Sequence, residues 1–252
     1  MARTWDVVRG EGPVVATAIH NGHDMRSDLA ELVLLREDER RREEDPYTDV
    51  LTEVAPTRIV VRRSRFEIDL NRDRDEAICV VPEDCWDLRV WKEPLADELL
   101  HESRALYERF YRDFEALLAD VERGHGRFVV LDLHSYNHRR AGPHAPPADL
   151  AENPEVNVGT GSMDRRRWGR LVDRFIADLS RRGLDVRENV KFRGRRMARF
   201  VHETFPETGC CLAVEFKKTF MDEHTGDVDH PRLQELKEAL ASTLPGLRQA
   251  LR

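Results

Sequence analysis

The chain has 252 residues, 35% of them charged, and a formal net charge of −7 at pH 7. This length is about the limit at which one hydrophobic core stops growing, and no Gly/Ser- or Pro-rich linker divides the chain, so we predict one domain over residues 1–252. A pI of about 5.8 and the lack of a ~18-residue apolar span or an apolar signal core exclude nucleic-acid and membrane partners and predict a soluble, cytoplasmic protein.

The order of apolar runs and amphipathic stretches indicates the fold class. Short apolar runs bounded by polar turns predict strands at residues 12–20, 57–70, 127–135 and 210–218. Amphipathic stretches predict helices at residues 94–124, 164–183 and 229–251, the last one broken near Pro245. Residues 35–49 should begin as an exposed helix that Pro46 stops, and residues 137–162 should form a long loop that covers a pocket. Strands alternating with long helices predict an α/β fold around a mainly parallel sheet.

Two histidines directly follow apolar, strand-like runs. His20 ends "ATAIH" and His134 ends "VLDLH", which places both where open α/β sheets bind their ligands. Neutral imidazole and carboxylate are the usual donors to a catalytic zinc, and Asp132 could orient His134 by a hydrogen bond. A single histidine in this position more often has a structural role in a buried turn. Two in the same context, beside acid-rich loops, favour a metal site.

The stretch "RSRFEIDLNR" (63–72) alternates charged and apolar residues. As a continuing strand it would present its arginines and acids, Arg63, Arg65, Glu67 and Asp69, on one side. That side is either a solvated edge with ion pairs, the more common case, or the wall of a charged cleft. In the cleft, Arg72 beside Asn71 would offer an anchor for a carboxylate.

Glu215 interrupts the apolar run "CLAVEF". A carboxylate in a buried strand is costly unless it is paired, and burial raises its pKa toward the range that suits a general base. Pairing with Lys217, on the same face of the strand, is the structural alternative. The sequence has no nucleotide-binding glycine motif and no GxSxG elbow, so Ser135 beside His134 does not indicate a serine hydrolase.

The four cysteines fit a reducing compartment. Cys79 and Cys85 are too far apart for a CxxC motif, and the neighbours Cys210 and Cys211 would point to opposite faces of a strand. We therefore expect all four to be reduced thiols.

Five motifs resemble one known family in type and order. They are "HNG", "EED" before "PYTD", "SRFEIDLNR", "LDLHS" and a C-terminal "EF", spread over residues 13–226. The sequence resembles the N-formylglutamate amidohydrolase family of the zinc metallocarboxypeptidase-like superfamily. This resemblance implies a three-layer α/β/α fold with a mixed central sheet, one zinc ion, and hydrolysis of the N-acyl amide of a small amino acid that bears a carboxylate.

The resemblance also assigns roles to particular residues. It makes His20, His134 and Asp45 the metal ligands, with Asp45 preferred to Glu44; the acid of the superfamily's HxxE motif would fall at His23. It makes Glu215 the general acid/base and Arg65 the residue that polarises the carbonyl. Asn71 and Arg72 would bind the substrate carboxylate, and Ser135 would make a further contact with the substrate.

Several alternatives remain open at this point. The nitrogen and oxygen donors also accept iron or manganese. The substrate could be another N-acyl amino acid or a peptide end. The arginine-rich stretch also fits a non-catalytic protein that binds carboxylates, and the high charge fits an interaction scaffold with structural histidines.

Overall fold

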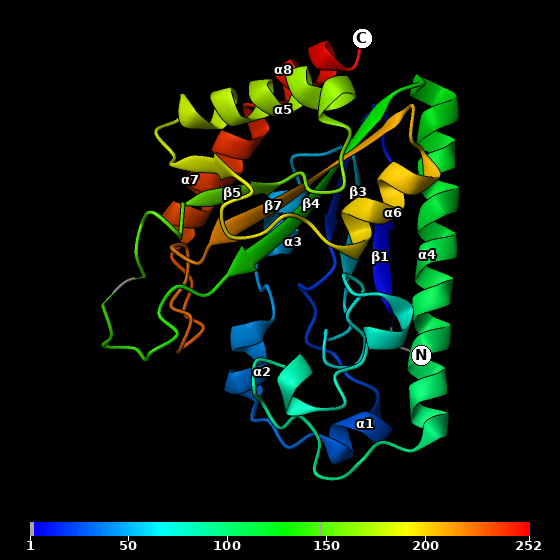
Figure 1. The fold of residues 1–252 in the computed structure, drawn as a ribbon, viewed down its shortest axis with the longest axis vertical. Coiled ribbons are helices and arrows are strands. Elements are labelled where there is room, and N and C mark those ends of the chain that lie inside the picture. The colour runs from blue at the N-terminus through cyan, green and yellow to red at the C-terminus, as the bar shows by residue number, and fades with distance from the viewer. Residues whose placement is uncertain (1–2, 147) are drawn as a thin grey trace.

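The computed structural model describes residues 3–146 and 148–252, whose strands form one mixed seven-stranded sheet (Figure 1). The strands are β1 (Trp5–Val8), β2 (Val14–Ala18), β3 (Thr57–Val61), β4 (Phe128–Tyr136), β5 (Val156–Gly159), β6 (Val186–Glu188) and β7 (Gly209–Lys217). Their order across the sheet is β1-β3-β2-β4-β7-β5-β6. The four central strands are parallel, whereas β1 is antiparallel to β3 and β5 is antiparallel to β7.

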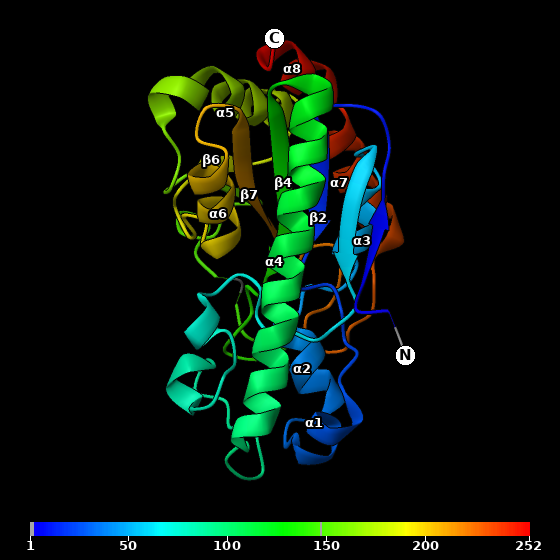
Figure 2. The same ribbon diagram turned by 90° about the vertical axis from the view of Figure 1, so that its right-hand side faces the viewer.

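Helices cover both faces of this sheet. The helices are α1 (Ser27–Leu32), α2 (Glu37–Glu43), α3 (Thr48–Thr52), α4 (Asp97–His125), α5 (Arg165–Ser180), α6 (Arg196–Thr204), α7 (His230–Ala241) and α8 (Leu244–Ala250), with short 3₁₀ turns η1 (Arg74–Glu76) and η2 (Pro82–Asp84). Helices α4 and α6 pack on one face, and α3, α5, α7 and α8 on the other (Figures 1 and 2). The predicted α/β/α fold is therefore confirmed. Within the described residues, no helix combines the length and apolar character needed to cross a membrane.

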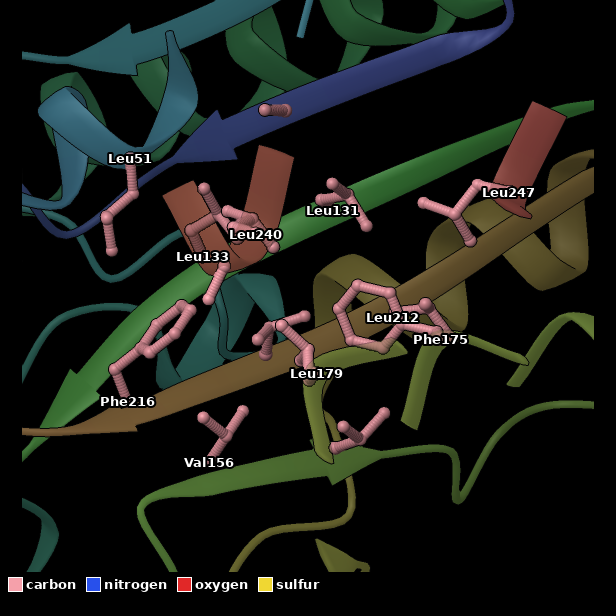
Figure 3. Close-up of a cluster of buried hydrophobic side chains, with 14 of the residues drawn as sticks. Leu51, Leu131, Leu133, Val156, Phe175, Leu179, Leu212, Phe216, Leu240 and Leu247 are labelled. Atoms are coloured by element: carbon pink, nitrogen blue, oxygen red, sulfur yellow. The ribbon is translucent and has the colours of Figure 1, made fainter. Parts of the chain in front are cut away.

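The central strands read as unbroken apolar runs because both of their faces are buried. Along β4, Leu131 and Leu133 point into the cluster under α5, α7 and α8 (Figure 3), whereas Phe128 and Val130 point into the cluster under α4 and α6. Leu212 of β7 joins the first cluster. This packing fixes the register of β4 against β7, which pairs His134 with Glu215.

The predicted elements agree with the structure along most of the chain. Strands β2, β3, β4 and β7 lie within or overlap the four predicted runs, and α4 and α5 lie close to their predicted ranges. The predicted break near Pro245 separates α7 from α8, whose first turn contains that proline. Residues 37–43 form the short helix α2 that was expected before Pro46.

The prediction that the strand at 57–70 continues through its charged half is wrong. Strand β3 ends at Val61, and the chain then turns so that Ser64 O accepts hydrogen bonds from Glu67 N–H and Ile68 N–H. Arg63 pairs with Glu67, and Arg65 with Asp69, four residues apart. Residues four apart can form ion pairs in a helical turn, and they also lie on the same side of a strand. The spacing of the charges is therefore compatible with both structures and did not distinguish a turn from a strand.

The predicted loop at 137–162 contains the strand β5. Four residues flanked by Asn, Pro and Gly carry little local strand signal. The strand exists because it pairs with β7, and Asn157 lies opposite Glu215. The first part of the loop does reach the pocket, which Asn137 and Arg140 help to line.

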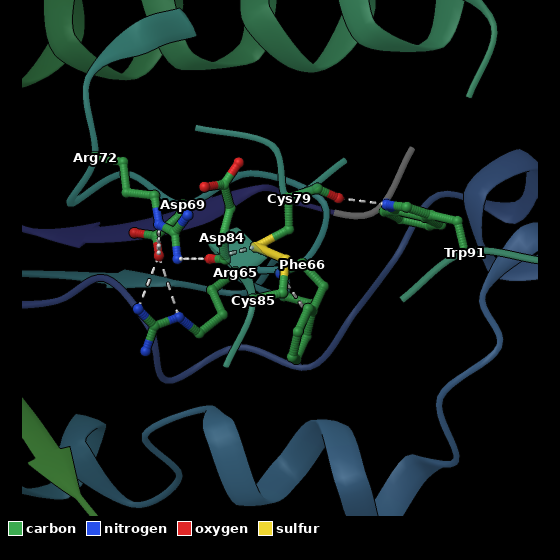
Figure 4. Close-up of a disulfide and its surroundings, with 9 residues drawn as sticks. Arg65, Phe66, Asp69, Arg72, Cys79, Asp84, Cys85 and Trp91 are labelled. Atoms are coloured by element: carbon green, nitrogen blue, oxygen red, sulfur yellow. Dashed lines mark hydrogen bonds and ion pairs between the residues drawn. A yellow bond between two sulfur atoms is a disulfide. The ribbon is translucent and has the colours of Figure 1, made fainter. Parts of the chain in front are cut away.

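The prediction of four reduced thiols is wrong for one pair. Cys79 and Cys85 form a disulfide (Figure 4). Cys210 and Cys211 are free and buried. The turn η2 between the first two cysteines brings their Cα atoms to 5.8 Å, within the normal range for a bridge. A spacing of six residues excludes a CxxC motif but does not exclude a disulfide.

Candidate active site

The polar residues of the site meet where the parallel strands end at one edge of the sheet. His20 follows β2, His134 lies near the end of β4, and Glu215 lies opposite His134 on β7. Asp45 arrives from the segment after α2, and its backbone N–H donates a hydrogen bond to His20 O at 2.9 Å. All four residues line one cavity of about 530 Å³. This is the ligand-binding edge of an open α/β sheet.

His20, Asp45 and His134 form a compact group that can hold a metal ion. The Nδ1 atom of His134 lies 3.1 Å from His20 Nδ1 and 3.1 Å from Asp45 Oδ2. His20 Nδ1 lies 3.4 Å from Asp45 Oδ2. The three donor atoms lie within 4.8 Å of one another, and all three residues are buried. Two imidazoles and a carboxylate match the donor set of catalytic zinc sites, which use three protein ligands.

The outer nitrogens of both histidines are bound by carboxylates, which supports this metal fit. His20 Nε2–H donates to Asp69 Oδ1 at 2.7 Å, and His134 Nε2–H donates to Asp132 Oδ2 at 2.9 Å. Thr17 Oγ1–H in turn donates to Asp132 Oδ1 at 2.8 Å. When the imidazoles are neutral, these bonds place the ring proton on Nε2 and leave both Nδ1 atoms, which lie next to Asp45, free to bind a metal ion. The sequence indicated this role for Asp132, but not for Asp69, whose contact with His20 depends on the turn after β3.

The structure brings Asp45, and not Glu44 or His23, to the two imidazoles. Glu44 Oε2 lies 2.5 Å from His23 Nδ1, and its other oxygen accepts a hydrogen bond from Ser64 Oγ–H. The chain around Asp45 is held by the buried Lys218, whose Nζ donates to Glu44 O at 2.7 Å and to Arg42 O at 2.6 Å. Neighbouring acids therefore have separate tasks, because the backbone at the end of α2 points them in different directions.

The charges within the group favour a bound cation. Burial alone would raise the pKa of Asp45, but hydrogen bonds from His134 and His20 lower it below its ordinary value. Burial opposes the charged form of His134, yet Asp132 and Glu215 raise its pKa well above the usual value. Asp45, Asp132 and Glu215 thus lie around the two buried imidazoles, and such a set of carboxylates can attract a divalent ion.

Glu215 faces the cavity without a cationic partner. No Lys or Arg among residues 3–146 and 148–252 forms an ion pair with it, so the proposed pairing with Lys217 is not made. Burial is the main reason that the pKa of Glu215 is raised to about 7. A carboxyl group with this pKa can both accept and return a proton near neutral pH.

The arginines after β3 form the charged wall of the cavity, so the cleft alternative holds for Arg65 and Asp69. Arg65 Nη2 donates to Asp69 Oδ2 at 2.7 Å, and Arg72 Nη2 donates to Asp84 O at 2.6 Å (Figure 4). Both guanidinium groups lie over the Trp86 ring, at 4.8 and 5.7 Å from its centroid. The turn closed by the Cys79–Cys85 disulfide therefore supports both arginines.

Asn71 and Ser135 also lie at the cavity. Asn71 Oδ1 accepts a hydrogen bond from Met197 N–H at 3.1 Å, which turns its amide nitrogen toward His134, 3.3 Å from Nε2. Ser135 Oγ–H donates to Asp45 Oδ1 at 3.4 Å. The structure thus gathers all eight sequence-predicted site residues around one cavity.

Comparison with known proteins decides the family. A family model described as N-formylglutamate amidohydrolase matches residues 12–221. The chain belongs to this family. The resemblance drawn from the five sequence motifs is therefore confirmed.

Two solved structures show the same fold as this N-formylglutamate amidohydrolase family member. N-formylglutamate amidohydrolase from Ralstonia eutropha JMP134 superposes with a TM-score of 0.74 at 19% identity, covering 98% of this chain and 96% of that one. A gene product of Agrobacterium tumefaciens gives a TM-score of 0.69 at 18% identity, with the same coverages of 98% and 96%. No curated protein matches the sequence.

In the metal-free form of this family member, Glu215→Gln is expected to increase the free energy of unfolding above pH 7. Folding raises the pKa of Glu215 from 4.5 to about 7, so the folded state binds this proton more tightly than the unfolded state does. The resulting stability is fully present below pH 4.5 and is lost as the pH rises through about 7, a difference of up to ~3 kcal/mol. The amide of the variant carries no charge and avoids this loss.

Urea unfolding of the metal-free wild type and variant, on both sides of this pH window, measures the difference. Equal stabilities above the window would show that Glu215 is not held in an environment that disfavours its charge.

Proposed function

We propose that this protein is a zinc-dependent amidohydrolase that cleaves N-formylglutamate to formate and glutamate. The observation that carries the proposal is one cavity in which three buried metal donors face an unpaired carboxyl group with a pKa of about 7. Family membership supports the reaction, and the arginine wall supports a substrate with a carboxylate.

His20, Asp45 and His134 would hold the metal ion. When bound, a divalent ion supplies a Lewis acid that activates water and polarises the amide carbonyl. Zinc is the metal that fits two imidazoles and a carboxylate best, because such a set leaves one of its four positions free. Asp69 and Asp132 hold the histidine rings in the required orientation.

Glu215 would move the proton. Its carboxylate accepts a proton from the water molecule whose oxygen attacks the formyl carbon. The same carboxyl group then returns the proton to the amide nitrogen as the C–N bond breaks, which releases formate and the free amino group. Because Glu215 ends the cycle as it began, no further acid is needed.

The arginine wall would orient the substrate and stabilise the developing negative charge. Asn71 and Arg72 would bind the carboxylate beside the scissile amide and so fix the amide in one pose. Arg65 would stabilise the oxyanion formed on attack, a contribution of ~2.7–4 kcal/mol where a single such donor has been removed from an enzyme. Ser135 would contact the substrate next to the metal ligands.

A substrate screen tests this function. Metal-free protein is reconstituted with Zn²⁺, Mn²⁺ or Fe²⁺ and assayed with N-formylglutamate, N-acetylglutamate and a short peptide, with formate and free amine as the measured products. We expect turnover of N-formylglutamate only after metal addition, and slower turnover of the bulkier acetyl compound. A protein that takes up metal and binds glutamate but hydrolyses none of the compounds would instead be a carboxylate-binding protein.

A further inference from the structure

A basic strip formed by residues 191–195 borders the mouth of the cavity. Its sequence is "KFRGR", and it connects β6 to α6. Lys191, Arg193 and Arg195 are exposed, whereas Phe192 and Gly194 between them are half-buried. All five residues line the same cavity as the metal donors and Glu215.

The backbone of the basic strip is held rigidly by its neighbours. The side chain of Asn157 donates to Phe192 O at 2.8 Å and accepts from Lys191 N–H at 2.9 Å. Gly161 N–H donates to Arg193 O at 2.7 Å. Gly194 has a φ of +83° and packs against Ala213, where a β-carbon would lie 3.3 Å away. The cationic side chains therefore project from a fixed frame.

The side chains of Arg193 and Arg195 differ from the other arginines of the cavity because they have no acidic partner among the described residues. Of the other arginines that line the cavity, Arg65 is paired with Asp69, and Arg140 with Glu43. Among the residues that the structure describes, no hydrogen bond or ion pair involves the guanidinium group of Arg193 or Arg195. In a chain with a net charge of −7, two uncompensated guanidinium groups at a cavity mouth favour an anionic ligand.

The basic strip spans the mouth from the proposed base to the proposed carboxylate anchor. At its start, the strip is bound by Asn157, the strand partner of Glu215. At its end, Arg196 N–H donates to Asn71 O at 3.3 Å. The acids Glu83 and Asp84, in the turn η2, also line this cavity, but neither forms an ion pair with the strip among the described residues. An anionic group of the substrate would lie against the strip.

We propose that Arg193 and Arg195 bind the side-chain carboxylate of the substrate, while Asn71 and Arg72 bind its α-carboxylate. This inference rests on the proposed function and assigns its specificity: the two arginines select an acidic amino acid over its neutral amide. Glutamate and glutamine differ at that one group and have nearly the same size. The rigid backbone of the strip fixes where both side chains begin, so only their rotamers have to be ordered on binding.

The test compares kcat/KM for N-formylglutamate and N-formylglutamine. We expect the metal-loaded wild type to prefer the glutamate compound by ~10- to 100-fold, the range for a hydrogen bond to a charged group. Arg193→Gln with Arg195→Gln should bring the ratio close to one by slowing the glutamate compound alone. Arg182→Gln is the control, because Arg182 is exposed and does not line the cavity; it should leave the ratio unchanged.

A binding measurement separates this inference from the proposed function. Calorimetric titration of the metal-loaded protein with glutamate and glutamine needs no turnover, and we expect the preference for glutamate to disappear in the double variant. If that preference appears without any hydrolysis, the proposed function fails and the anion subsite stands. If the double variant loses turnover or binding equally for both compounds, or keeps the wild-type ratio, the subsite is overturned.

Discussion

Replacing Glu215 with Gln is expected to lower kcat for N-formylglutamate by ~10²–10⁴-fold, the usual contribution of a general acid/base. The introduced amide keeps the size and polarity of the side chain but cannot accept the proton of the attacking water. Because Glu215 is not one of the three clustered donors, the variant should still bind one metal ion per chain. Steady-state kinetics and metal analysis on the same preparation check both parts. Glu203→Gln, an exposed change on α6, is the matched control and should retain full activity.

The pH dependence provides a second measurement on the same residue. The base must be ionised to work, so kcat/KM should rise with pH until Glu215 has lost its proton. Burial raises the pKa of Glu215 to about 7, and a cation beside it favours the charged form, so the midpoint of the rise should fall between 4.5 and about 7. A Glu215→Gln variant with wild-type turnover would assign the proton transfer to another group and remove the proposed mechanism.

Removal of one metal donor is expected to abolish both metal binding and turnover. Asp45→Asn or His134→Ala leaves two donors, and a site of two donors in water competes poorly for a divalent ion. We expect activity to fall to background and metal content to fall from one ion per chain to a small fraction. Measurement of bound metal after dialysis, and the absorption spectrum of the Co²⁺-substituted protein, report on the site without relying on turnover.

The neighbouring acid provides the control for this prediction. Glu44→Gln changes a carboxylate one position away that binds His23 and Ser64 instead of the metal donors. This variant should retain its metal and most of its activity. If Glu44→Gln loses the ion while Asp45→Asn keeps it, the assignment of the third donor has to be reversed.

Much of the site could be predicted because strand ends are recognisable in the sequence. His20 and His134 each follow an apolar run, and parallel neighbouring strands bring such positions to one edge of the sheet. Glu215 stood out because a charge within a buried run is costly. Asp45 was selected over Glu44 by the family resemblance, since two adjacent acids look alike until the backbone orients them.

The features that were missed depend on contacts between distant parts of the chain. Asp69 reaches His20 only because the chain turns after Val61, where the alternating pattern predicted a strand. The strand β5 forms by pairing with β7, far away in sequence. The basic strip looks like an ordinary charged loop until the fold places it at the cavity. Local sequence patterns indicate burial and secondary-structure propensity, but they do not indicate which distant segments of the chain pack against each other.

The buried Lys218 links the segment that carries the metal donor Asp45 to the strand that carries the proposed base Glu215. Its ammonium group donates hydrogen bonds to the backbone carbonyls of Arg42 and Glu44, at the end of α2. Lys218 itself directly follows β7, which carries Glu215. The segment before Asp45 and the strand that carries Glu215 are therefore tied to each other through one buried side chain. The spacing between Glu215 and the metal donor Asp45 thus depends on this buried contact and not on the exposed side chains of α2.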